Sequence, residues 1–99
     1  MSDREFLSVD PGTLHLPGGR LDGVDPMKLH RQLARHGMSV AGMPPLEVSR
    51  GIDGELVINY GVTRATRVSK YLPGTSVIVE DTGTLPVAVG GMPTVRDRR

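Results

Sequence analysis

Apolar and polar residues alternate along this chain with two different periods, and each period predicts one kind of element. Residues 46–49 alternate with period two, as in a strand, and an apolar run resumes at residues 56–58 after an Asp-Gly turn signal at 53–54. We expect these two segments to pair as an antiparallel hairpin. The β-branched run at residues 76–79 is suited to a strand that is buried on both faces.

Two weaker strand signals complete the expected sheet. Residues 13–16 could form a short strand that ends at a Pro-Gly-Gly turn over 17–19. Residues 85–89 could add an edge strand, because Pro86 has no backbone N–H to donate to a second neighbour. Combining the hairpin with the later strand predicts a mixed sheet.

The first helix is predicted from the signals at its two ends. Asp25 is a preferred N-cap residue, and Pro26 follows it at the first helical position, where proline is favoured. Gly37 stands where a helix commonly ends in a glycine. These signals bracket a helix over residues 27–36.

A second helix is expected over residues 62–72, directly after Gly61 and before a Pro-Gly stop at 73–74. At 100° per residue the small and apolar residues fall on one side. The other side is polar and basic, and carries Thr63, Arg64, Arg67 and Lys70.

The junction between residues 56–58 and the second helix is the strongest candidate for a binding site. A glycine allows the tight turn at Gly61, and the helix that follows points free N–H groups and partial positive charge beyond its first turn. Arg64 lies in that first turn, where a cation opposes the helix dipole unless an anion is near. We therefore expect a phosphate-bearing ligand here. The alternative is a solvated helix whose arginines contact nothing.

Composition limits the function more than it defines it. The 99 residues make a single domain, and the net charge of +1 argues for no general attraction to nucleic acid or membrane. Cysteine is absent and no apolar run reaches bilayer length, so we expect a soluble, cytoplasmic protein. We expect a flexible lead-in over residues 1–12, a domain over 13–89 and a mobile basic tail over 90–99.

The order of these elements resembles the ParB/sulfiredoxin superfamily. Three blocks match in order: residues 14–20 resemble an early proline-arginine box, 25–38 the first helix, and 45–80 the strand, hairpin, strand, G-x-x-R helix and following strand. The G-x-x-R piece itself is the run from Gly61 to Arg64. The resemblance implies a small α/β (α+β) fold with two main helices, and a nucleotide-phosphate site.

Carried over residue by residue, the resemblance implies that Gly61, Arg64 and the less closely matching Thr63 bind phosphate, with Arg20 contributed by the early box; Arg67 is added from the basic helix face. Val62 stands where sulfiredoxins carry their reactive cysteine, which excludes sulfinic-acid reduction. Tyr60 stands where nuclease-like and kinase-like members often carry an acidic residue.

Three functions remain open from the sequence. The first is a regulatory binding module for a nucleotide, with Mg²⁺ as a candidate companion ion. The second is a residual Mg²⁺-dependent nuclease or phosphotransferase that uses Asp22 or Glu47. The third is a protein-interaction domain that regulates or inhibits another bacterial protein. Whether nucleic acid is a partner stays open, and no catalytic residue or metal ligand is assigned.

Overall fold

The computed structural model describes residues 5–37 and 39–99, and it has the expected class: a mixed sheet with helices. Besides the two main helices, the described residues form one short helix and two 3-10 turns. In chain order the elements are β1 (Glu5–Val9), η1 (Pro11–Thr13), η2 (Gly18–Arg20), α1 (Pro26–His36), β2 (Leu46–Arg50), β3 (Leu56–Tyr60), α2 (Val62–Tyr71), β4 (Val77–Thr84) and α3 (Val95–Arg98).

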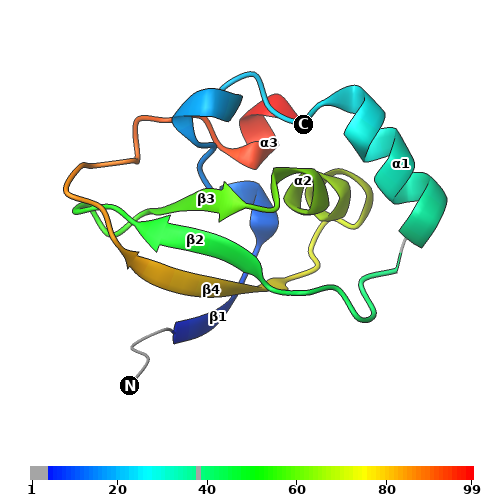
Figure 1. Cartoon of the computed structure of the whole chain (residues 1–99), viewed down its shortest axis with the longest axis horizontal. Coiled ribbons are helices and arrows are strands. Elements are labelled where there is room, and N and C mark those ends of the chain that lie inside the picture. Colours follow the sequence, from blue (N-terminus) through cyan, green and yellow to red (C-terminus); the bar gives the residue numbers. More distant parts are fainter. Residues whose placement is uncertain (1–4, 38) are drawn as a thin grey trace.

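The four strands lie in the order β1-β4-β2-β3 (Figure 1). Strands β2 and β3 form the predicted antiparallel hairpin, while β4 pairs parallel to β2 and antiparallel to β1. Because α2 follows β3 immediately and leads back to β4, the start of α2 lies at the end of the hairpin. This connection places the Gly61 turn at the border between sheet and helices.

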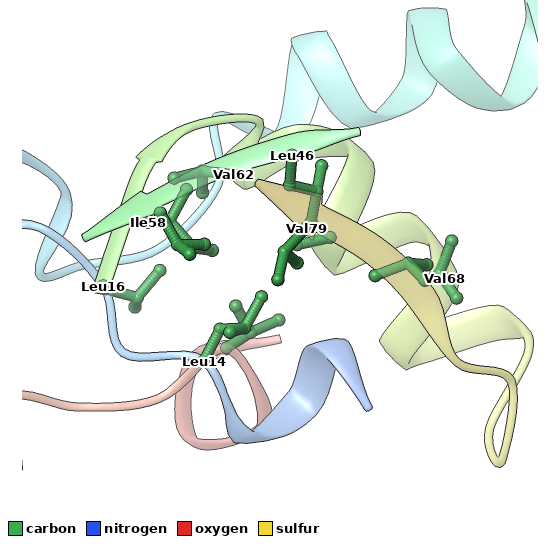
Figure 2. Packing of buried hydrophobic residues seen from close by; sticks show 11 residues of the cluster. Leu14, Leu16, Leu46, Ile58, Val62, Val68 and Val79 are labelled. Atoms are coloured by element: carbon green, nitrogen blue, oxygen red, sulfur yellow. The ribbon is translucent and has the colours of Figure 1, made fainter. Parts of the chain in front are cut away.

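The core lies between the sheet and the helices (Figure 2). Leu46, Ile58 and Val79 come from three neighbouring strands, and each is fully buried. Val68 of α2 and Leu14 pack against them. Burying one such side chain stabilises the fold by roughly 1.5–3 kcal/mol.

Helix α1 begins and ends where the sequence predicts. The Asp25 side chain accepts a hydrogen bond from the Met27 N–H at 2.9 Å, and Pro26 occupies the first turn. Gly37, at φ +57°, donates its N–H to the Leu33 carbonyl oxygen at 2.8 Å. The local capping signals are therefore confirmed.

Both ends of the described chain belong to the fold, which corrects the expected lead-in and tail. Residues 5–9 form β1 on the edge of the sheet, where a lead-in was expected. Val95 of α3 is 1% exposed, and its N–H donates to the Leu14 carbonyl oxygen at 2.9 Å. Neither end of the sequence has a long apolar pattern that would predict a strand or a helix. These two elements are recognised from the segments that they contact, β4 for β1 and the segment around Leu14 for α3. Residues 1–4 lie outside the described residues.

Three expected strand features are wrong. In β4 only Val77 and Val79 are buried, because Ile78 points to a face of the sheet that leaves it 47% exposed. Residues 85–89 form no strand, and residues 13–16 contribute only the isolated bridges of His15.

Among the described residues, no helix has the length and apolar character needed to cross a membrane.

Candidate functional site

The Gly61 turn accepts no side chain, for two separate reasons. Gly61 has φ +111°, a backbone conformation that L-residues with a side chain rarely adopt. A Cβ at this position would also lie 2.5 Å from Cδ2 of Leu46, a fully buried side chain. Glycine at this position thus lets the chain turn from β3 directly into α2 while Leu46 packs against the turn.

The amides of the first turn of α2 are open. The first helical hydrogen bond runs from the Ala65 N–H to the Gly61 carbonyl oxygen at 2.9 Å. Within the described residues, the N–H groups of Val62, Thr63 and Arg64 have no acceptor, and the glycine N-cap supplies no side chain. These donors are the part of a helix that binds anions.

A cavity of about 260 Å³ lies against this turn, between α1 and the start of α2. Gly61 itself belongs to its wall, and none of the described residues that line it is Asp or Glu. Its lining includes three cations, and the polar lining residues are Arg20, Lys28, Gln32, Asn59, Tyr60, Thr63 and Arg64. The cavity therefore combines positive charge with unpaired N–H donors.

Arg64 is held in place while most of its donors stay free. Its Nη1 donates to the Pro44 carbonyl oxygen at 2.9 Å, and its guanidinium lies 5.3 Å from the centroid of the Tyr60 ring. A guanidinium has five N–H donors. Within the described residues only this one bond is made, so the others are available to a ligand in the cavity.

Arg67 lies outside the 260 Å³ cavity, although it lines a much smaller cavity of about 60 Å³ together with Arg64. The sequence placed it on an exposed basic face, but it is 1% exposed, and its Nη1 donates to the carbonyl oxygens of Gly37 and Ser39 at 3.0 and 2.7 Å. Desolvation by burial lowers the pKa of this guanidinium. The loop between α1 and β2 covers this side of α2, which a helical periodicity cannot reveal.

The structure thus brings Arg20, Gly61, Thr63 and Arg64 together around one cavity and leaves Arg67 outside it. Sequence reasoning missed Lys28 and Gln32, which α1 contributes from two positions one turn apart. The available signal was that residues 26–36 contain no acidic residue. Oε1 of Gln32 is buried without a hydrogen-bond partner in the described structure.

The remaining candidates for chemistry lie elsewhere. Asp22 lines a separate hollow formed by residues 18–25, which Arg20 also lines, and Glu47 pairs with Tyr60 in the β2–β3 ladder. The described residues contain no group of three or more His, Cys, Asp or Glu that could hold a metal ion. His15 is 7% exposed, and its Nδ1–H donates to the Met92 carbonyl oxygen at 2.7 Å, which is a structural role.

Comparisons with known proteins leave the site to be interpreted from its own geometry. The chain matches no protein-family model, and searches of the curated proteins and of the solved structures found no significant match.

Proposed function

We propose that this protein is a binding module for a phosphate-bearing ligand, such as a nucleotide, held at the start of α2. The observation that carries the proposal is a cavity lined by Arg20, Lys28 and Arg64 against three backbone N–H groups, to which residues 5–37 and 39–99 contribute neither a carboxylate nor a hydrogen-bond acceptor. An anion there would satisfy the open donors and offset the cations at the same time.

Each part of the cavity has a defined task in this proposal. The amides after Gly61 and the Thr63 hydroxyl donate to one phosphate, and Arg64 adds a charge-assisted hydrogen bond. Arg20 closes the site from the opposite loop, and Lys28 adds charge from α1. Mg²⁺ would enter only with the phosphates of a nucleotide, because the described lining of the cavity includes no carboxylate.

The proposal agrees with the resemblance to the ParB/sulfiredoxin superfamily, in which the turn equivalent to residues 61–64 binds nucleotide phosphates. It departs from the catalytic members, because Val62 replaces the reactive cysteine and Tyr60 replaces the acidic residue. A regulatory role without turnover therefore fits these residues better than a Mg²⁺-dependent nuclease or phosphotransferase.

The test is thermal unfolding in the presence of nucleoside mono-, di- and triphosphates and inorganic phosphate, with and without Mg²⁺. A ligand at about one hundred times its Kd stabilises the folded state by about 2.7 kcal/mol. For a domain of this size the unfolding midpoint should rise by roughly 10–20 °C.

Arg64→Ala should weaken binding about tenfold, since it removes a charge-assisted hydrogen bond from the ligand. Lys70→Ala is the matched control, because Lys70 is an exposed cation on the same helix that does not line the cavity. A flat response to every phosphate compound, or equal losses in the two variants, would contradict the proposal.

A further inference from the structure

The site at the start of α2 continues into a second basic hollow along α1. This hollow has a volume of about 600 Å³ and is lined by Lys28, Arg31, Gln32, Ala34, Arg35 and Thr63. Lys28, Gln32 and Thr63 line both hollows, so the two form one continuous surface. An anion held at Gly61 would therefore have the second hollow directly beside it.

The cations of the second hollow form a stripe on α1. Lys28, Arg31 and Arg35 follow one another at spacings of three and four residues, which places them on one face of the helix. All three side chains are exposed. From the first to the last, the stripe covers about 10 Å along the helix axis at 1.5 Å per residue.

No negative charge within the surface balances this stripe. Within the described part of the chain, no Asp or Glu lines either hollow, and Arg31 and Arg35 make no hydrogen bond or ion pair. The nearest acidic residues in the sequence, Asp22 and Asp25, line a different hollow beside Arg20. In a chain whose net charge is only +1, five cations on one continuous surface are a marked segregation of charge.

We propose that the ligand is a linear chain of phosphate groups, of which one is held at the Gly61 turn and the next ones follow the α1 stripe. This inference rests on the proposed function and extends it from a single phosphate to an extended polyanion. The shared chemistry is that of a single-stranded nucleic-acid backbone and of inorganic polyphosphate.

Recognition on this surface is by charge and not by base. Among the described residues that line the two hollows, Tyr60 is the one aromatic residue, and Arg64 already lies over its ring. Proteins that read single strands by stacking use several aromatic side chains. The surface therefore favours sequence-independent contact with successive phosphates, which depends steeply on salt.

The experiment compares three probes on the full chain: inorganic orthophosphate, medium-chain inorganic polyphosphate and a short single-stranded oligothymidylate. Binding of each is measured over a series of salt concentrations for the wild type, Arg31→Ala, Arg35→Ala and Lys70→Ala. All three side chains are exposed, so the unfolding midpoints of the variants should match the wild type and show that they fold.

A chain-like probe should bind more tightly than orthophosphate. Arg31→Ala and Arg35→Ala should each weaken its binding by roughly three- to fivefold, as expected for an exposed charge contact. Each should also reduce the slope of log affinity against log salt by about 0.7, the contribution of one phosphate contact on a single strand. Lys70→Ala and orthophosphate binding should stay unchanged.

The outcomes separate this inference from the one it rests on. Binding of polyphosphate, of oligothymidylate or of both, with the expected dependence on Arg31 and Arg35, supports the inference and identifies the source of the chain. Orthophosphate binding that depends on Arg64, without any gain for the chain-like probes, overturns the inference and leaves the proposed function intact. No binding by any of the three probes overturns the inference, and it overturns the proposed function as well if the nucleotides also leave the unfolding midpoint unchanged.

Discussion

Gly61 shows how one residue position serves both the fold and the candidate site. Its left-handed backbone conformation turns the chain, and the absence of a Cβ lets Leu46 approach. The same turn leaves the following amides open toward the cavity. Two structural requirements thus favour glycine at position 61: the positive φ and the close approach of Leu46. Substitutions can separate these two requirements.

Gly61→Ala should lower the free energy of unfolding by about 3 kcal/mol, because it adds a steric overlap with Leu46 to the strain of a positive φ. Gly74→Ala is the matched control: Gly74 has φ +86°, but a Cβ there would meet no atom within 4 Å. Its loss should be about 1 kcal/mol. Urea denaturation measures both, and equal losses would show that the approach of Leu46 contributes nothing.

Arg67 illustrates the opposite case, in which a charged residue of the predicted site has a structural position. Its guanidinium connects α2 to the main-chain carbonyls of the loop after α1, and its Nε is buried without a partner. A buried cation without a carboxylate is costly, and hydrogen bonds to carbonyl oxygens offset part of that cost. Arg67 therefore fixes the loop that holds Arg64 through Pro44.

At the scale of elements, the short helix α3 completes the core although its sequence suggests a solvated tail. Thr94 and Asp97 form a capping box, and the Arg99 guanidinium donates to the Ser69 carbonyl oxygen at 2.6 Å. These contacts hold Val95 in the core beside Leu14. A helix this short depends on its tertiary contacts, because its few backbone hydrogen bonds do not stabilise it alone.

Val95→Ala should therefore lower the free energy of unfolding by about 2 kcal/mol, through lost burial and the cavity left behind. Arg96→Ala on the same helix should cost less than about 1 kcal/mol, because its ion pair with Asp10 is exposed. Chemical denaturation of both variants provides the comparison. Losses below about 0.5 kcal/mol in both would instead support a mobile tail over residues 90–99.

At the scale of the whole molecule, carboxylates connect distant parts of the chain. Asp53, in the β2–β3 hairpin, accepts hydrogen bonds from the N–H groups of Gly90 and Val89 at 2.8 and 3.3 Å. The N–H of Gly90, more than those of Val89 and Glu55, lowers the pKa of Asp53. Similarly, the Thr94 N–H lowers the pKa of Asp97. The Asp53 carboxylate thus connects the segment after β4 to the hairpin, and the Asp97 carboxylate makes a hydrogen bond within that segment.

These directions predict that the protein loses stability in acid. A carboxyl group whose pKa is lower in the folded state stabilises the fold above its unfolded pKa of about 4, and this contribution is lost as the pH falls through the folded pKa. The thermal midpoint should decrease below about pH 4, and Asp53→Asn should show a smaller decrease.

The control for this prediction is Asp22→Asn, because the Asp22 carboxylate accepts no hydrogen bond within the described part of the chain. The thermal unfolding midpoint of Asp22→Asn should change with pH in the same way as that of the wild type. Thermal unfolding recorded from neutral to acidic pH tests all three proteins. Parallel curves for the wild type and Asp53→Asn would show that the connection from Asp53 to Gly90 contributes no acid sensitivity.

Features that depend only on neighbouring residues could be predicted from the amino-acid sequence. Asp25 and Pro26 start α1, the Asp-Gly turn closes the β2–β3 hairpin, and Gly61 begins α2. Each of these is set by local backbone angles or by a side chain bonding to its own segment, so no knowledge of distant residues is needed.

The tertiary structure was needed to show which faces of the helices and strands are buried. It exposed Ile78, buried Arg67 and Val95, and brought Lys28 to the cavity that Arg20 and Arg64 share. A hydropathy pattern records what each residue prefers, but burial depends on which distant segment packs against it. The proposed site for a phosphate chain arises in the same way, since its charges come from three separate segments of the chain: the loop that carries Arg20, helix α1 and the start of α2.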